Sequence, residues 1–321
     1  MATNPLVSVL VVTWNRCQEL MKSLESVQVQ TYANRELVIV DNASTDGTAE
    51  MVRERFPEAV LVRSHKNLGC PSGRNLGVAN CTGKYVYFLD DDGWLERDAL
   101  EKVVARAESD ETLGVIMSQI RMMDGDRFVE ARPVGLSEPC YRSTFSGGCS
   151  LIRRDIFEQF GFPDDFFRQA EEDDLTLRMM DVGRYCYFDP ESVMYHKPSP
   201  INRNMPMFVY FGLRNTQKTG LRYWPFPYNI LRVLRIALYG LQFAVIRGRV
   251  FWPAWLFGNF VRDMLTLRGH RKPVRMATFR MFLELKKRPS SIHPGTHQCP
   301  KRRSVSGSMR RIRSGGQSTW T

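Results

Sequence analysis

Short apolar runs alternate with amphipathic stretches through the N-terminal part of the chain. "LVSVLVVTWN" and "RELVIVDNAS" have the length and β-branched content of strands, and the amphipathic "CQELMKSLESVQ" lies between them. "AVLVRSH" and "KYVYFLDDD" repeat the pattern, each after a further helical stretch. Strands that are joined through a helix run parallel in one sheet. The alternation therefore predicts an α/β fold with a Rossmann-like, mostly parallel central sheet flanked by helices.

Three of the predicted strands end in polar clusters, at residues 13–15, 41–43 and 90–92. In doubly wound sheets the ligand binds beyond the C-terminal ends of the strands. We therefore expect one crevice to contain all three clusters.

The third cluster places Asp90, Asp91 and Asp92 side by side, so that their charges need compensation. If the strand continues through the triplet, Asp90 and Asp92 share one face and Asp91 points the other way. Such paired carboxylates suit Mg²⁺ or Mn²⁺, ions that keep positions open for substrate phosphates. The pattern indicates a metal site for a diphosphate; taken alone, the triplet is also compatible with a solvated acidic loop.

The charge of the chain is divided along its length. Residues 1–196 hold 21 Lys and Arg against 32 Asp and Glu, whereas residues 197–321 hold 24 against 2. An anionic membrane surface and a nucleic acid are both suitable partners for such a basic segment.

Residues 226–261 are apolar and aromatic but are interrupted by arginines, and only 11 residues separate Arg235 from Arg247. No apolar run therefore reaches the length of a membrane span. Aromatic residues mixed with spaced arginines are typical of an interfacial helix. The alternative is a helical pair that packs on the body of the protein with its arginines in water.

The seven cysteines are an odd number and form no CxxC pair, and "MATNPLVSVLVV" has neither the basic region nor the cleavage site of a signal peptide. These features predict reduced thiols in a cytoplasmic protein.

Five motifs give the chain a resemblance to a known family. "VSVLVVTWNR", "LVIVDNASTDGT", "NLGCPSGRNLG", "GKYVYFLDDDG" and "AEEDDLTLRMMDVG" occur in the order and spacing of the inverting nucleotide-sugar glycosyltransferases of family 2, which have the GT-A fold. The segments "YHKPSPINR" and "YFGLRN" look similar to the bacterial rhamnosyltransferase-like and galactofuranosyltransferase-like branch.

The resemblance covers roughly residues 7–200 and leaves the C-terminal third largely outside, and the chain is expected to divide into three regions. Residues 1–200 are expected to form a GT-A catalytic domain, with a nucleotide-binding half at 1–97 and an acceptor-side half at 98–200. Residues 201–287 are expected to be a basic, aromatic-rich helical extension. Residues 288–321 contain almost no large apolar residue and are expected to be a disordered basic tail.

The resemblance also implies a nucleotide-sugar site. It places the first polar cluster on the nucleotide, Asp41 at the base and ribose, and the segment 66–74 over the nucleotide and diphosphate. The alternative for Asp41 is a helix cap, and Trp94 is expected either to stack on a sugar or to lie in the core. The expected nucleotide-sugar ligands are Thr13, Asn15, Arg16, Asp41, Asn42, Lys66, Asn67, Gly69, Arg74, Asp90, Asp91 and Trp94.

The general base is expected in "AEEDDLTLR". Inverting transfer needs one carboxylate that takes the proton from the acceptor hydroxyl. Alignment on "LTLR" makes Glu172 the base by resemblance, although the family usually has Asp there, and Asp173 is the rival. Asp174 and Arg178 are spaced as an ion pair within a helix, which is the role that we favour for Asp174.

The resemblance adds His196 to Asp90 and Asp92 as the third metal ligand, the alternative being a surface histidine. The paired glycines of "FSGGCSL" would let the backbone approach the donor sugar or the metal closely. Arg203 and Arg214 follow, and for each of them a solvated role is favoured over contact with a diphosphate or an anionic acceptor.

These expectations describe an inverting glycosyltransferase that depends on Mn²⁺ or Mg²⁺. It would move a sugar from a UDP- or dTDP-sugar to a hydroxyl of a cell-surface glycan or lipid-linked intermediate, on the inner face of the cell membrane. The alternative is a nucleic-acid-binding protein that uses its basic C-terminal third on a non-catalytic body. A metal-dependent nucleotidyltransferase is a third reading, disfavoured because no Gly-rich phosphate loop follows the first strand.

Overall fold

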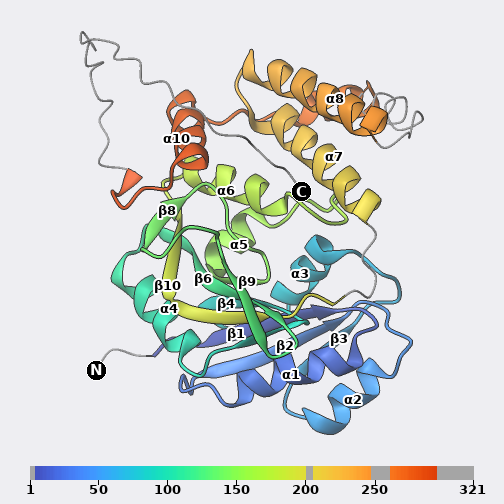
Figure 1. The fold of residues 1–321 in the computed structure, drawn as a ribbon, viewed down its shortest axis with the longest axis vertical. Helices are drawn as coiled ribbons and strands as arrows, with labels where there is room; N and C mark the ends of the chain where they lie inside the picture. The colour runs from blue at the N-terminus through green and yellow to red at the C-terminus, as the bar shows by residue number, and fades with distance from the viewer. Residues whose placement is uncertain (1–3, 200–204, 247–260, 295–321) are drawn as a thin grey trace, which may run out of the picture.

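The predicted alternation of strands and helices is present in the computed structural model, which describes residues 4–199, 205–246 and 261–294. The N-terminal half of the sheet and its helices lie at the bottom of Figure 1. In chain order these elements are β1 (Val7–Thr13), α1 (Cys17–Gln28), β2 (Arg35–Asp41), α2 (Thr48–Arg55), β3 (Val60–Arg63), α3 (Cys70–Val78) and β4 (Tyr85–Asp90).

The central sheet is mixed, in the order β3-β2-β1-β4-β9-β6-β10-β5. The first four strands are parallel, as expected, but β9 runs antiparallel to both β4 and β6. Two short strands pair outside this order, β7 with β6 and β8 with β10. The remaining strands are β5 (Gly93–Leu95), β6 (Leu113–Asp124), β7 (Arg127–Arg132), β8 (Cys140–Arg142), β9 (Cys149–Arg153) and β10 (Tyr185–His196).

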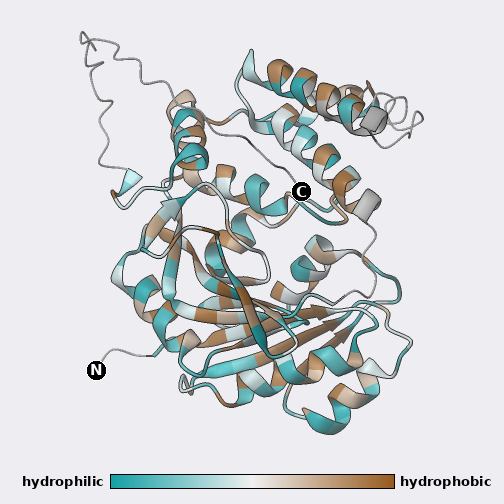
Figure 2. Ribbon diagram, viewed as in Figure 1, coloured by the Kyte–Doolittle hydropathy of each residue, from teal (hydrophilic) through white to brown (hydrophobic). Residues whose placement is uncertain are grey.

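The middle strands are covered on both faces, which explains their unbroken apolar sequences. Val9, Leu10 and Val11 of β1 are consecutive and all buried. A Cβ atom at Gly77 of α3 would lie 2.3 Å from a methyl carbon of Leu10, so the glycine lets this helix pack closely against β1. Figure 2 shows the hydrophobic residues concentrated in these central strands.

The second half of the chain adds helices to this sheet and extends above it in Figure 1. These elements are α4 (Ala99–Ser109), α5 (Arg154–Phe160), α6 (Glu171–Asp181), α7 (Met205–Tyr223), α8 (Tyr228–Ile246), a 3₁₀ turn η1 (Arg268–His270) and α10 (Met276–Lys287).

The last described helix of the C-terminal region packs on the body of the protein. Phe279 and Phe282 of α10 are at most 2% exposed and belong to the same hydrophobic core as the sheet. A boundary at residue 200 therefore does not separate α10 from the core formed by residues 1–200.

The expectation that the tail is disordered from residue 288 is wrong for its first residues. Ser290 exchanges two backbone hydrogen bonds with Tyr141, and His293 bonds through Nε2 to the hydroxyl of Thr112 at 2.9 Å. Residues 295–321 lie outside the described part of the chain, as does Arg203.

Among residues 4–199, 205–246 and 261–294, no helix combines the length and the apolar character needed to cross a membrane.

Candidate functional site

The acidic triplet lies at the end of β4 but does not continue the strand. The strand ends at Asp90, and Asp91 and Asp92 form a turn before β5. The expected strand geometry, in which Asp90 and Asp92 share a pleat face, was therefore wrong. In this turn Asp91 contacts Thr13 and Arg16, and Arg16 also contacts Asp92.

Asp90, Asp92 and His196 form one cluster, in which one potential ligand atom of each side chain lies within 4.8 Å of the others. His196 ends β10, opposite Gly93 of β5, and its Nε2 lies 2.8 Å from Oδ1 of Asp92. The other oxygen of Asp92 accepts a hydrogen bond from the backbone N–H of Ser199 at 3.0 Å. Two carboxylates and an imidazole are donors that fit Mn²⁺ or Mg²⁺, so these residues suit the expected metal.

Arg16 compensates part of the negative charge of the triplet. Its Nη1 lies 2.7 Å from Asp91 and 3.2 Å from Asp92, and the hydroxyl of Thr13 donates to Asp91 at 2.9 Å. Burial still raises the pKa of the Asp91 carboxyl to about 6, against the effect of Arg16. Thr13 and Arg16 therefore hold the acidic turn itself.

Arg74 of α3 connects the metal cluster to the start of α6. The guanidinium is buried and lies 3.2 Å from Asp90 and 3.4 Å from Glu171. Desolvation acts to lower the pKa of Arg74, but the neighbouring Cys70, Asp90 and Glu171 together hold this pKa above its ordinary value. One cation thus stabilises two carboxylates that come from β4 and α6.

The paired glycines make room for these side chains. A Cβ atom on Gly148 would lie 1.9–2.0 Å from the Asp90 carboxylate, and one on Gly147 would lie 2.4 Å from Nη1 of Arg74. The glycines thus let the backbone lie close to Asp90, Arg74 and Glu172, and its approach to a donor sugar or a metal stays a prediction.

Glu172 faces this glycine pair, and its Oε1 accepts a hydrogen bond from the N–H of Gly147 at 3.2 Å. Burial and the neighbouring Glu171 raise the pKa of Glu172 to about 8, against the effect of Arg74. The rival Asp173 turns outward and lies 2.5 Å from Nζ of Lys286 on α10. Asp174 pairs with Arg178 at 2.6 Å, which confirms its expected role within the helix.

The other polar clusters are brought together by hydrogen bonds between loops. Asn15, with φ 52°, accepts a bond from the N–H of Thr45 at 2.8 Å, and the N–H of Asn42 donates to Thr13 O at 2.9 Å. The side chain of Asn42 bonds to Asn67 and to the backbone of Leu68 and Gly69. Hydrogen bonds thus connect the first two clusters, and the Thr13–Asp91 bond connects the third to them, whereas a shared ligand crevice stays a prediction.

Asp41 is fully buried and accepts bonds from the N–H of Ser44 at 2.8 Å and from Nε of Arg63 at 3.1 Å. It does not cap a helix, because α2 begins at Thr48 with Gly47 as its N-cap. Contact of Asp41 with a nucleotide stays a prediction.

Trp94 and Lys66 differ in their surroundings. The Trp94 ring is stacked on Tyr195 at a centroid distance of 5.6 Å, and Nζ of Lys22 lies 3.2 Å from the centre of the ring. These contacts give Trp94 a packing role, whereas Lys66 is exposed on its loop.

Arg214 of α7 lies 3.8 Å from Asp263.

Asn215 is a residue whose role sequence reasoning missed. It is fully buried in α7 and donates to the backbone oxygens of Arg168 and Gln169, both at 2.8 Å. Gln169 and Ala170 have φ of 71° and 68°, a conformation that is costly for residues other than glycine. Asn215 lies in "YFGLRN", so the motif was recognised, but its contact with the start of α6 was not.

The fold and the site together indicate a class of protein. A mixed α/β sheet with an acidic turn and a histidine at its strand ends is the arrangement of the GT-A fold. Residues 8–161 match the family model Glycosyl transferase family 2, so this segment of the chain is similar to that family.

Comparisons with individual proteins agree with this assignment. The chain is 34% identical over 119 residues to the glycosyltransferase GlyA of Streptococcus pneumoniae, an alignment that covers 36% of this chain and 17% of GlyA. The structure of S. aureus TarS 1–349 in complex with UDP superposes with a TM-score of 0.58 at 19% identity, covering 80% of each chain. The mannosyltransferase PcManGT from Pyrobaculum calidifontis, in complex with GDP-Man and Mn²⁺, gives a TM-score of 0.55 at 18% identity, covering 88% of this chain and 80% of that one.

Proposed function

We propose that the protein is an inverting, metal-dependent glycosyltransferase that uses a nucleoside diphosphate sugar, with UDP- and dTDP-sugars favoured. Asp90, Asp92 and His196 would hold the Mn²⁺ or Mg²⁺. The bound cation would neutralise the charge that develops on the leaving diphosphate.

Glu172 would act as the general base. Its carboxylate takes the proton of an acceptor hydroxyl while that oxygen attacks the anomeric carbon, and the bond to the diphosphate breaks on the opposite side. Asp173 is the weaker candidate, because its carboxylate is bonded to Lys286.

The observation that supports this proposal most strongly is the position of Arg74. It contacts Asp90 on one side and Glu171 on the other, while Glu172 lies against the glycine pair beside it. The metal cluster and the candidate base are thereby held on adjacent sides of one buried cation, as a displacement between donor and acceptor requires.

The acceptor is proposed to be a hydroxyl of a cell-surface glycan or of a lipid-linked intermediate. The family match and the UDP complex of TarS support the donor class. Membership of the rhamnosyltransferase-like and galactofuranosyltransferase-like branch rests on "YHKPSPINR" and "YFGLRN".

A donor screen tests the proposal. Hydrolysis of UDP-, dTDP- and GDP-sugars is measured with Mn²⁺. Donor affinity and sugar transfer to an added hydroxyl acceptor are then compared between the natural protein and Glu172→Gln. We expect hydrolysis of at least one donor, and a loss of sugar transfer in Glu172→Gln with donor affinity retained. Full transfer by Glu172→Gln would refute the assignment of the base. Hydrolysis of no donor, combined with tight and strongly salt-dependent nucleic-acid binding, would favour the alternative function.

We propose peripheral attachment to the inner face of the cell membrane. Leu234, Leu238 and Leu241 lie on one side of α8 and are 56%, 61% and 49% exposed, a stripe that suits insertion into a lipid interface. Co-sedimentation with anionic vesicles should decrease when Leu234 and Leu238 are both replaced by Glu. A natural protein that stays in the supernatant at low salt would contradict attachment.

A further inference from the structure

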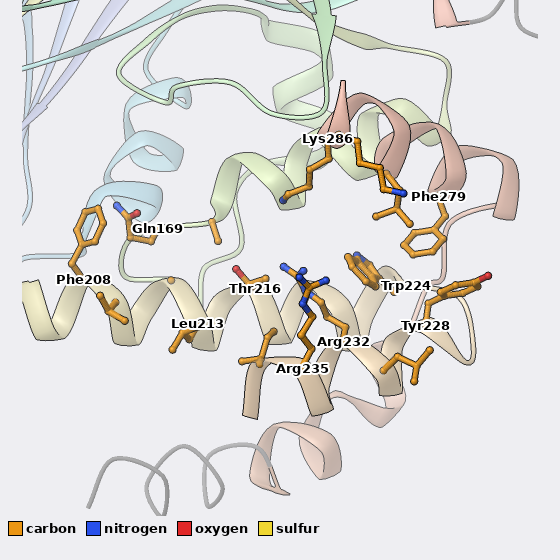
Figure 3. Close-up of a pocket in the computed structure, with 17 residues that line it drawn as sticks. Gln169, Phe208, Leu213, Thr216, Trp224, Tyr228, Arg232, Arg235, Phe279 and Lys286 are labelled. Carbon is orange, nitrogen blue, oxygen red and sulfur yellow. The ribbon is translucent and has the colours of Figure 1, made fainter. Parts of the chain in front are cut away.

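A cavity of about 820 Å³ lies among α7, α8, α10 and the loop before α6. Figure 3 shows Trp224, Tyr228 and Phe279 at one end of it and Phe208 and Leu213 toward the other. Most of the lining is apolar, so the cavity suits a hydrocarbon chain or ring.

The polar part of the lining is positively charged. Arg232 and Arg235 enter from α8, and Lys286 and Lys287 enter from α10. Among the described residues that line the cavity there is no carboxylate, and Asp173 is the acidic neighbour that pairs with Lys286. The cavity therefore carries an excess of positive charge.

Arg232 shows that this charge is incompletely compensated. Its guanidinium carbon lies 4.8 Å from the Trp224 ring centre, and its Nε is buried without a hydrogen-bond partner among the described residues. Burial and the nearby Arg235 lower the pKa of Arg232, against the effect of Asp173. A buried donor of this kind is costly unless an anion bonds to it.

The cavity adjoins the candidate base. Gln169 and Ala170, which precede α6, form part of its lining, and Lys286 connects it to Asp173, the neighbour of Glu172. On the side of α8 away from Arg232, the helix exposes the leucine stripe described above. A ligand in the cavity therefore lies beside the turn that begins α6, two residues before Glu172.

We propose that this cavity binds the acceptor, and that the acceptor is an anionic amphiphile: an apolar chain that carries a phosphate next to its glycan. This inference rests on the proposed function. The arginines bind the phosphate, the aromatic and aliphatic lining binds the chain, and the glycan reaches Glu172. The apolar lining and the leucine stripe favour a lipid phosphate over a free anion.

Binding of three probes tests the inference: decyl phosphate below its micelle concentration, decanol and inorganic phosphate. The variants are Arg232→Gln combined with Arg235→Gln, and Gly212→Trp. Gly212 lines the cavity, and a Cβ atom added to it meets nothing within 4 Å, so the indole has room to fill the space. Arg280→Gln, an exposed arginine of α10 outside the lining, is the control.

We expect decyl phosphate to bind at least about tenfold more tightly than either other probe, because it uses both the charge and the apolar lining. Each cavity variant should bind decyl phosphate about tenfold or more weakly than the natural protein does. Arg280→Gln should bind it as tightly as the natural protein. Equal binding of inorganic phosphate or of decanol, or binding that neither cavity variant weakens, would overturn the inference.

Donor hydrolysis without acceptor separates this inference from the proposed function. The cavity variants should hydrolyse donor as the natural protein does, because they lie outside the metal cluster. If the natural protein hydrolyses no donor, the proposed function fails. The comparison of the three probes still decides which class of ligand binds in the cavity.

Discussion

Arg74 is the side chain on which both parts of the candidate site depend. It is buried, and it compensates Asp90 of the metal cluster and the buried Glu171 at the start of α6. Removing one partner of a buried ion pair leaves an uncompensated charge, which costs more than the pair itself contributes.

Arg74→Gln should therefore lower the free energy of unfolding by about 3–5 kcal/mol. Urea denaturation at pH 7 measures the change. The matched control is Arg53→Gln, which breaks an exposed pair with Glu50 and should cost no more than about 1 kcal/mol. Equal midpoints for the two variants would contradict the importance of Arg74.

The pH dependence of transfer should report Glu172. Because burial and Glu171 raise the pKa of Glu172 to about 8, the group is largely protonated at neutral pH in the absence of ligands. A base must be deprotonated, so kcat/KM should increase as pH rises toward 8. The rising limb of this pH profile reflects the titration of Glu171 and Glu172 together, because the two carboxyl groups interact.

Glu171→Gln removes a negative neighbour and should move this limb to lower pH. Asp173→Asn should move it less, because Asp173 is a smaller contributor to the raised pKa. The measurement is kcat/KM for the acceptor between pH 5 and 9. A limb that does not move in Glu171→Gln would rule out Glu172 as its source.

At the scale of elements, α7 determines where α6 begins. Asn215 binds the carbonyls of Arg168 and Gln169, and Thr219 donates to Asp174 at 3.0 Å. These bonds hold Gln169 and Ala170 in the left-handed conformation that orients the first turn of α6. The carboxylates at the start of α6, which include the proposed base Glu172, are thus positioned from the C-terminal region.

Asn215→Ala should lower the free energy of unfolding by about 1–3 kcal/mol, since it leaves two carbonyls without their donor. Because Asn215 positions the start of α6, Asn215→Ala should also lower kcat, whereas donor affinity should change little. Asn80→Ala, which removes a similar bond to Leu76 on the surface, serves as control. Loss of stability with an unchanged kcat would mean that Asn215 has only a structural role.

At the scale of the whole molecule, α10 completes the hydrophobic core. Phe279 is 1% exposed, and its ring lies 4.8 Å from that of Trp224. Phe279→Ala should therefore cost about 3–5 kcal/mol in unfolding free energy. Leu238→Ala, on the exposed stripe of α8, should change it by less than about 0.5 kcal/mol. A similarly small loss for Phe279→Ala would show that the extension is separable from the body.

The sequence predicted those parts of the fold that depend on local pattern. The strands and helices up to β4 follow from the spacing of apolar residues, whereas the antiparallel insertion of β9 and the docking of α10 depend on contacts between distant segments. The periodicity of apolar residues within one segment does not indicate which distant segments it contacts.

In the candidate site, too, some features follow from the local sequence and others depend on contacts between distant segments. The motifs located Asp90, Asp92 and His196, but the turn after Asp90 and the partners of Arg16, Arg74 and Asn42 required the tertiary structure. Their side-chain types allow several partners, and the sequence alone does not choose among them.

The acidic turn and His196 are proposed to bind a cation that carries the donor diphosphate. UDP affinity, measured by titration calorimetry with Mn²⁺ and with EDTA, tests this proposal. Mn²⁺ should tighten UDP binding at least about tenfold in the natural protein and in the exposed control Asp126→Asn, and much less in His196→Gln. UDP binding that is equally tight in EDTA, or an undiminished Mn²⁺ effect in His196→Gln, would contradict the claim.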